Sequence, residues 1–452
     1  MGEKILELLR GRRIKELRQL LADVNSADVA AIVDELVDDG KISREELLLL
    51  FRIFPKDTAS ETFVEMSSET KETLIKGFND VELREVLNDL FLDDAVDIIE
   101  EMPAGVVKRI LKNVDTDTRK SINQLLNYPD DSAGSIMTIE YVDLKKSMTV
   151  QEAFARIRAT GVDKETIYTC YVTDSNRKLL GLVSVKDLLL ANYEDIVGDI
   201  MEENVISVTT SDDQELVVQV FGKYDFIALP VVDSEQRLVG IITVDDAIDV
   251  MQEEFTEDIE KMAAITPTDK PYLKMTPFEI WRARIPWLLL LMVSATFTGM
   301  IIRSFEQALA AQIALTAFIP MLMDTGGNSG SQASVTVIRG LTLGDVEFSD
   351  IFRVIWKETR VAVLCGITLA AGAFAKLMLF DKVGLAISIT VSLTLAVTVA
   401  LAKVVGGTLP MLSKKAGFDP VVMSAPFITT IVDAISLFVY FRIASAILHL
   451  AG

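Results

Sequence analysis

Carboxylates are the side chains whose number and spacing in this sequence point to chemistry. They form groups within the first 258 residues, and the acids of these groups are Asp93, Asp94 and Asp97, then Asp212, Asp213, Glu215, Asp225, Asp245, Asp246 and Asp249, and finally Glu253, Glu254, Glu257 and Asp258. Acids at i, i+3 and i+4 of a helix repel one another, and a cation relieves that repulsion. Mg2+ prefers oxygen ligands and keeps several of its waters, so loose clusters suit it. Each group alone is also typical of a solvated helix face, but together they favour a protein that senses cations.

A single acid, Asp433, lies in the middle of an otherwise apolar stretch near the C-terminus. A charge at the centre of a bilayer costs about 3 kcal/mol even on lenient insertion scales, so such a residue is functional by default. Pro426, a turn or two earlier, would free backbone carbonyls as further oxygen ligands. The alternative is a protonated, hydrogen-bonded aspartate with a structural role.

A second polar segment, MDTGGNSGSQAS at 323–334, interrupts another apolar stretch and contains Asn328. Irregular polar backbone at membrane depth is tolerated only where it is buried in protein or lines a wet cavity. The segment therefore lines a path through the membrane, or its small residues allow close packing of helices.

The elements that would position these residues differ sharply between the two parts of the chain. Residues 271–452 contain five apolar stretches long enough to span a bilayer, at about 285–302, 308–337, 361–380, 384–411 and 421–448. Basic residues gather after the second and fourth stretches, as at Arg339, Arg353 and Lys414. By the positive-inside rule, the N-terminus is expected in the cytosol and the C-terminus outside.

Charge is divided in the same way. Of 452 residues, the first 270 contain 56 Asp+Glu and 30 Lys+Arg, whereas the remainder contains 10 and 14. So acidic a part repels phosphates, which excludes nucleic acid as a partner, and attracts cations. The 2 Cys, in different parts of the chain, predict no disulfide and fit a reducing cytosol.

Two internal repeats organise the acidic part. Residues 54–66 resemble residues 90–102 after a shift of 36, which is typical of a helical-hairpin solenoid, although unrelated short helices would also fit. Further on, Asp174, Gly181 and Asp187 recur as Asp233, Gly240 and Asp246, each shifted by 59. This strand–turn–strand–helix pattern resembles a tandem pair of CBS domains over about 136–252.

In CBS domains, a Ser/Thr-x-x-Asp sequence at the start of the last helix often holds the ribose of an adenine nucleotide. Ser184 with Asp187, and Thr243 with Asp246, match it here. The same four residues would equally form helix-capping boxes.

The whole chain resembles the MgtE family of bacterial magnesium channels. The resemblance rests on YPDDSAGSIMT at 128–138, the CBS pair, the acidic segment after it, MDTGGNSGSQAS, and APFITTIVDAIS at 425–436. It implies a homodimer in which both protomers line one central pore, with Asp433 as the selectivity carboxylate for hydrated Mg2+ and Asn328 nearby. It also implies cytosolic Mg2+ sensors at Asp93, Asp97, Asp213, Glu215, Asp225, Asp246, Asp249, Glu254, Glu257 and Asp258. Some members bind ATP between the CBS copies, which implies a nucleotide site at Tyr171, Ser184 and Asp187.

The expected architecture is a multi-domain membrane protein. It comprises an all-α superhelical N-domain at 1–130, an α/β tandem CBS pair at 131–252, an acidic connecting helix at 253–278, and a pore domain of five transmembrane helices at 279–452. The expected function is Mg2+ uptake through a multi-pass channel of the bacterial inner membrane, driven by the membrane potential and closed by Mg2+ on the cytosolic domains.

Two other functions compete with this one. A proton- or ion-coupled transporter of divalent cations would use Asp433 as its proton carrier. A membrane-anchored, nucleotide-sensing enzyme or scaffold would use the CBS pair. The enzyme is disfavoured because the sequence has a lone His449 and no P-loop or nucleophile–base set.

Overall fold

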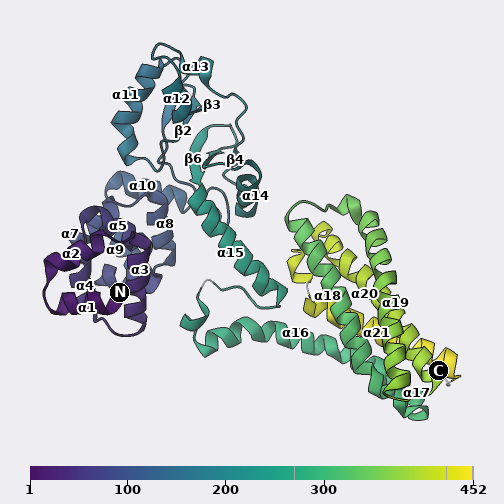
Figure 1. Ribbon diagram of the computed structural model, residues 1–452. Coiled ribbons are helices and arrows are strands. Elements are labelled where there is room, and N and C mark those ends of the chain that lie inside the picture. The colour runs from purple at the N-terminus through teal and green to yellow at the C-terminus, as the bar shows by residue number, and fades with distance from the viewer. Residues whose placement is uncertain (269, 424, 450–452) are drawn as a thin grey trace. The chain divides into compact units, whose positions relative to one another are not determined.

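The computed structural model describes residues 1–268, 270–423 and 425–449. The chain divides into two compact units, Met1–Met251 and Gln252–Gly452, which are described separately (Figure 1).

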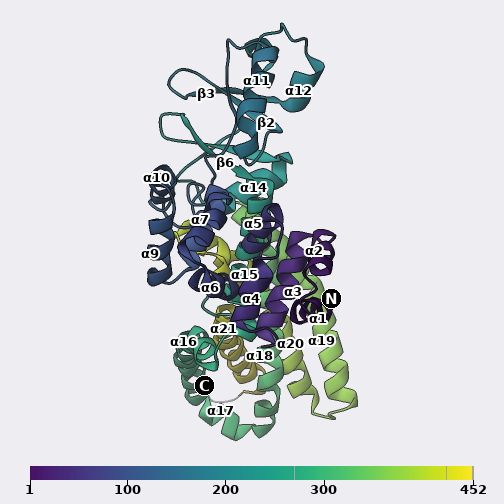
Figure 2. The same ribbon diagram turned by 90° about the vertical axis from the view of Figure 1, so that its left-hand side faces the viewer.

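Ten helices open the first unit (Figures 1 and 2). They are α1 Gly2–Arg10, α2 Ile14–Ala22, α3 Ser26–Asp38, α4 Arg44–Phe51, α5 Lys56–Val64, α6 Ser68–Gly77, α7 Asp80–Asn88, α8 Leu92–Glu101, α9 Ala104–Asn113 and α10 Thr116–Leu125. From α4 onward a helix begins every 12 residues. Most packed pairs are alternate helices, such as α3 with α5 and α8 with α10, so the hairpin repeat is 24 residues long. The 36-residue echo in the sequence instead relates helices three apart.

Side-chain caps begin four of these helices, α3, α4, α7 and α10, and apolar faces pack the helices together. Ser43 with Glu46, and Asn79 with Glu82, form complete capping boxes at α4 and α7. Phe51 contacts other core aromatics, and Phe63 and Phe78 lie within 6 Å of it between ring centroids. Each short helix buries its apolar face only against its neighbours, as a solenoid requires.

Two three-stranded sheets follow, as the 59-residue repeat predicts. In the first, β1 Asp143–Lys145 pairs in parallel with β2 Thr169–Thr173, which pairs antiparallel with β3 Leu179–Ser184. In the second, β4 Val208–Thr209, β5 Ala228–Val232 and β6 Leu238–Thr243 repeat this topology. Helices α11 Val150–Thr160, α12 Val185–Leu190, α13 Val197–Ile200 and α14 Gln214–Tyr224 accompany the sheets.

Hydrogen bonds between the two copies obey the same repeat. The amide of Leu179 donates to the carbonyl of Gln236, and the amide of Leu238 donates to the carbonyl of Arg177. Both pairs are related by the 59-residue shift, so the copies face each other about a pseudo-twofold axis. Gly181 and Gly240 are required at equivalent positions, because a Cβ on either would lie 2.7 Å from a backbone carbonyl oxygen.

Helix α15 Val244–Met262 closes the second CBS copy and continues into the acidic segment. The acidic connecting helix expected at 253–278 is therefore not a separate element, and its helix ends at Met262. Pro267 and Pro271 follow, and no helix forms in the described residues 263–268 and 270–271.

The second unit is helical. After η2 Tyr272–Lys274 come α16 Pro277–Ser304, α17 Glu306–Ala311, η3 Ile313–Phe318, α18 Ile319–Thr342, η4 Phe348–Asp350, α19 Ile351–Leu379, α20 Leu385–Lys415, η5 Val421–Met423 and α21 Ala425–Leu448. Within the described residues, four segments are long and apolar enough to cross a bilayer, and they are Pro277–Ser304, Phe348–Leu379, Leu385–Lys415 and Ala425–Leu448.

The polar segment 323–334 is regular α-helix within α18, so the expectation of irregular backbone is wrong. The helix survives because its small residues are packed tightly. Gly326 and Gly330 contact Val432 of α21, and Gly330 faces Gly406 of α20 so closely that a Cβ on Gly406 would lie 2.1 Å from the Gly330 oxygen. Close packing and a polar face are thus combined on one helix.

Candidate metal-binding sites

One carboxylate cluster in the first unit is the strongest candidate for a cation site. Helix α8 begins at Leu92, whose amide donates to Oε2 of Glu140 at 3.1 Å. The next residue, Asp93, is 8% exposed. One carboxylate oxygen each from Asp93, Glu140 and Glu165 lie within 4.8 Å of one another, close enough for one partly hydrated ion to contact all three.

Glu140 and Glu165 meet because of the strand arrangement. Glu140 precedes β1 and Glu165 precedes β2, and these strands run parallel, so both acids lie at the same edge of the sheet. The Glu165 amide donates to the Glu140 carbonyl at 2.9 Å, which fixes the pair. Oε2 of Glu165 is buried without a hydrogen-bond partner, a state that a bound cation would relieve.

Asp94, Asp97 and Asp246 extend the cluster. Asp246 lies in the first turn of α15, where Oγ1 of Thr243 donates to it at 2.6 Å. Its charge acts on Asp94 and Asp97 of α8 and on Glu165. The sequence prediction of Asp93, Asp97 and Asp246 therefore names residues that the fold brings together, whereas Glu140 and Glu165 were missed.

Burial and mutual repulsion raise the pKa values of these acids. Burial acts first in each case, and the pKa reaches about 7 for Asp93 and Asp246, about 6 for Asp94, and about 8 for Asp97 and Glu165. Lys71 is the one cation among the charges that act on these acids in the described residues, and it lowers only the pKa of Asp94. Carboxylates held together with so little positive charge are a donor set for a hard divalent cation.

The other predicted sensor residues of the first unit are Asp213, Glu215, Asp225 and Asp249, which lie on α15 and on or at the ends of α14. Asp213 caps α14 by accepting from the Glu215 amide at 2.8 Å, while Asp225 ends α14 in the left-handed conformation, with φ of 55°. The 12 residue steps between the two aspartates correspond to roughly 18 Å along a helix axis. Asp213 and Asp225 of one chain therefore cannot share an ion. Asp249 of α15 is exposed, and burial and then Asp245 raise its pKa.

A third acidic group lies in the second unit. Glu254, Glu257 and Asp258 of α15 are half-buried. Burial and then the charge of Asp419, in the loop before α21, raise the pKa of Asp258. Asp419 therefore joins the predicted group, although its distance in sequence hid the association.

The apolar helices of the second unit present a polar face. Asp433 on α21 is half-buried, and its charged neighbour is Asp324 of α18. Asn328 follows Asp324 by four residues, so both point from one side of α18, and both are exposed. Nearby, Gly327 packs against Thr429, which holds α18 and α21 together at this level.

The predicted nucleotide residues have local roles in the described structure. Ser184 and Asp187 form a complete capping box at α12, in which the Ser184 hydroxyl donates to Oδ2 of Asp187 at 2.5 Å. Tyr171 is fully buried, and its hydroxyl has no hydrogen-bond partner. Of the two interpretations of Ser184 and Asp187, capping is therefore directly visible.

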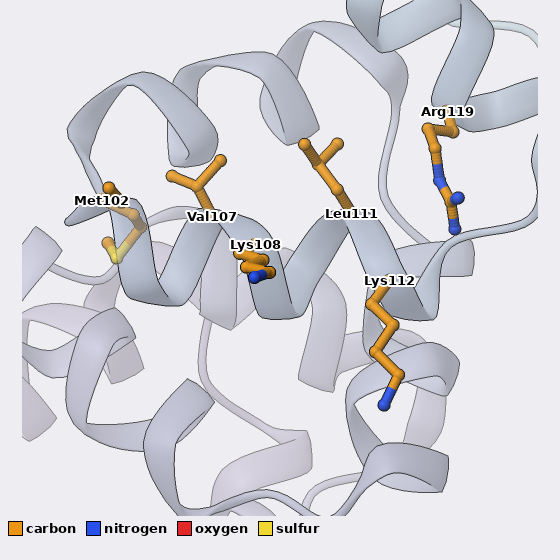
Figure 3. A pocket seen from close by; sticks show the side chains of 7 residues that line it. Met102, Val107, Lys108, Leu111, Lys112 and Arg119 are labelled. Atoms are coloured by element: carbon orange, nitrogen blue, oxygen red, sulfur yellow. The ribbon is translucent and has the colours of Figure 1, made fainter.

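A cavity of about 630 Å3 lies elsewhere in the solenoid (Figure 3). It is lined by Met102, Ala104, Val107, Lys108, Leu111, Lys112 and Arg119. Because this lining is apolar and basic, the cavity is unsuited to a cation.

Comparison with known protein families matches three regions of the chain. Residues 319–443 match the MgtE divalent cation transporter domain, residues 24–131 match the MgtE intracellular N domain, and residues 133–194 and 197–253 match CBS domains.

Relatives match the chain from end to end. The magnesium transporter MgtE of Thermus thermophilus is 36% identical, covering 99% of both chains, and that of Bacillus subtilis is 32% identical, covering 99% of this chain and 97% of the relative. A crystal structure of the cytosolic domain of the Mg2+ channel MgtE in complex with ATP is 36% identical, with a TM-score of 0.51, and covers 55% of this chain and 100% of that one. On this similarity, the chain belongs to the MgtE family.

Proposed function

We propose that this protein is a Mg2+-selective channel for magnesium uptake. The proposal rests above all on the polar face formed by Asp433, Asp324 and Asn328 on otherwise apolar helices. A carboxylate facing lipid would cost about 3 kcal/mol or more, so this face requires water or protein. A pore supplies both, and Asp433 with Asn328 would hold an ion that keeps most of its waters.

The pore is proposed to form between two copies of the chain. Two Asp433 carboxylates would then share one hydrated ion, with each copy contributing the polar face of α18. Helix α18 would be the fifth membrane span, beside the four apolar candidates. The polar residues of α18 make it less apolar than those four segments, and the same residues suit it to line a pore.

The membrane potential is sufficient to drive uptake. A divalent ion moving toward the negative interior gains about 4.6 kcal/mol per 100 mV, which is twice the value for a single charge. The acidic domains would lie in the cytosol and the helices in the bacterial cell membrane. The proposed domains are 1–130, 131–252, a connecting segment at 253–278 that begins within α15, and 279–452.

Regulation would come from Mg2+ on the acidic groups. Mg2+ bound to the cluster around Asp93, and to the acids of α14 and α15, would favour the closed arrangement. The size of this effect equals the difference between its binding free energies for the closed and open arrangements. The sensor residues proposed are Asp93, Asp97, Asp213, Glu215, Asp225, Asp246, Asp249, Glu254, Glu257 and Asp258, now with Glu140, Glu165 and Asp419. The CBS pair would bind ATP near Tyr171, Ser184 and Asp187, by analogy with the ATP complex of the similar cytosolic domain.

Flux into liposomes tests the proposal. The wild type is compared with Asp433→Asn under a K+ diffusion potential and without a pH gradient. Loss of the carboxylate should reduce Mg2+ flux at least about tenfold, which corresponds to about 1.4 kcal/mol. Asp345→Asn is the matched control, because Asp345 is an exposed acid in a loop of the same unit.

Two results would count against a channel selective through Asp433. Undiminished flux in Asp433→Asn would remove the carboxylate from the ion path. Flux that requires a pH gradient, and does not follow voltage, would favour the coupled transporter instead.

A further inference from the structure

A lysine occupies the centre of the acidic group in the second unit. Nζ of Lys261 lies 2.7 Å from Oε1 of Glu257 and 3.0 Å from Oδ2 of Asp419. Glu257 is one turn earlier on α15, whereas Asp419 lies in the loop between α20 and α21. The ammonium therefore joins the end of α15 to that loop.

The loop presents Asp419 in a fixed position. Its other oxygen, Oδ1, accepts a hydrogen bond from the Val421 amide at 2.8 Å, at the start of η5. Only Oδ2 is then directed to the lysine. The Lys261 side chain is 26% exposed, so its ion pairs are partly shielded from water.

Charge in this group is incompletely balanced. The acids that face the lysine are Glu257, Asp258 and Asp419, and the second cation acting on Asp258 is Arg339 of α18. In this group of five residues, called the Lys261 network below, three carboxylates against two cations leave one negative charge. Without Lys261, the excess would be two.

We propose that Lys261 is a built-in competitor of Mg2+: its ammonium occupies the position between Glu257 and Asp419 that Mg2+ takes when the channel closes. This inference rests on the proposed function, in which Mg2+ on the acids of α15 favours closure. Lys261 thereby raises the Mg2+ concentration at which the ion replaces the weaker ammonium link between α15 and the loop before α21.

Ion geometry makes the two cations exclusive. Mg2+ holds its oxygens at 2.0–2.1 Å in an octahedron, whereas the ammonium contacts the same oxygens at 2.7 and 3.0 Å. Both cannot contact one pair of carboxylates, and like charges repel. When Mg2+ binds, the ammonium moves to water on its flexible four-carbon stem.

The magnitude follows from the exposure of the pairs. A partly exposed ion pair changes an equilibrium by a factor of about two to five. Two such pairs must be broken before Mg2+ binds, and removal of the positive charge also strengthens attraction for the ion. Neutralising Lys261 should therefore lower the Mg2+ midpoint by about fivefold or more.

Protease protection of the full-length chain in nanodiscs tests this inference. Chymotrypsin is suitable because it does not cut at lysine and cuts after aromatic residues. Phe255 and Tyr272 are exposed and lie before and after Lys261 in the sequence. Cleavage at these sites is measured against Mg2+ concentration for the wild type, Lys261→Met and Lys261→Arg. Lys270→Gln is the matched control, because Lys270 pairs with Glu279, outside the network.

We expect a midpoint about fivefold lower for Lys261→Met, while Lys261→Arg and Lys270→Gln stay close to the wild type. An unchanged or higher midpoint in Lys261→Met, with normal Mg2+ protection of the wild type, overturns the competitor role but leaves the proposed function intact. Absence of Mg2+ protection in the wild type overturns the proposed closure and the competitor role together. If Lys261→Met does not fold, Lys261→Gln takes its place.

Discussion

Replacing Asp97 by Asn is expected to stabilise α8 when Mg2+ is absent. Burial and the neighbouring carboxylates raise the pKa of Asp97 from 3.8 to about 8 in the folded chain. An unfolded chain releases this proton near pH 4, so the folded chain binds more protons between about pH 4 and 8. Stability contributed by this residue is therefore lost as pH rises through that window, opposite to the usual carboxylate.

The size of the effect follows from the shift. Keeping a fully buried carboxyl protonated at pH 7, about three pH units above its ordinary pKa, would cost about 4 kcal/mol at 1.36 kcal/mol per pH unit. Part of Asp97 is exposed to solvent, and screening there reduces this cost to about 2 kcal/mol. The asparagine amide has no such cost, so a gain of about 2 kcal/mol is expected at pH 7 to 8, and less than about 1 kcal/mol at pH 5.

Hydrogen exchange of the α8 amides in the full-length protein measures this gain. After correction for intrinsic exchange rates, Asp97→Asn should exchange about 30-fold more slowly than the wild type at pH 7 to 8 without Mg2+. Saturating Mg2+ should protect the wild type more than the variant, because the variant lacks a proposed ligand.

The control is Asp117→Asn on α10, where the side chain is 93% exposed and pairs with Lys120. That change should leave exchange of α8 unaltered at every pH. Faster or unchanged exchange of α8 in Asp97→Asn without Mg2+ would refute the view that repulsion dominates this cluster.

Two further substitutions test the packing and the extent of the sites. Gly406→Ala should lower the thermal midpoint of the purified protein by separating α18 from α20, at a cost of about 1–3 kcal/mol. The reason is that the added Cβ would lie 2.1 Å from a facing carbonyl oxygen. Gly372→Ala is the control and should have no such effect, because its Cβ would have no atom within 4 Å. Glu165→Gln should weaken Mg2+ protection of α8 about tenfold, the scale of one lost charged contact, and an unchanged Mg2+ titration would exclude Glu165 as a ligand.

Repeats made much of the fold predictable. The 59-residue shift in the sequence located both sheets, and the need for glycine at Gly181 and Gly240 is explained by carbonyls that approach within 2.7 Å of an added Cβ. The helical repeat was visible only indirectly. Met66 and Met102 match across 36 residues, but the pairs that pack follow a 24-residue period, because stacking depends on burial rather than on residue identity.

Long-range contacts could not be predicted in the same way. Glu140 and Glu165 are isolated acids in the sequence, and only the parallel register of β1 and β2 brings them to Asp93. The regular helix through 323–334 was also hidden, since glycine and serine are weak helix formers. Its stability comes from contacts with α20 and α21, as at Gly330 and Gly406.

Repulsion between carboxylates is balanced by nearby cations to different extents in the cluster around Asp93 and in the group around Asp419, and this difference has a functional consequence. Around Asp93, five half-buried or buried acids and the exposed Asp97 act on one another, while Lys71 is the only cation among the described charges that reduces a pKa there. Around Asp419, Lys261 and Arg339 already neutralise most of the charge. A cation is bound more tightly where less positive charge must be displaced. Rising Mg2+ should therefore occupy the cluster of the first unit first and the Lys261 network later, which would make closure graded rather than a single step.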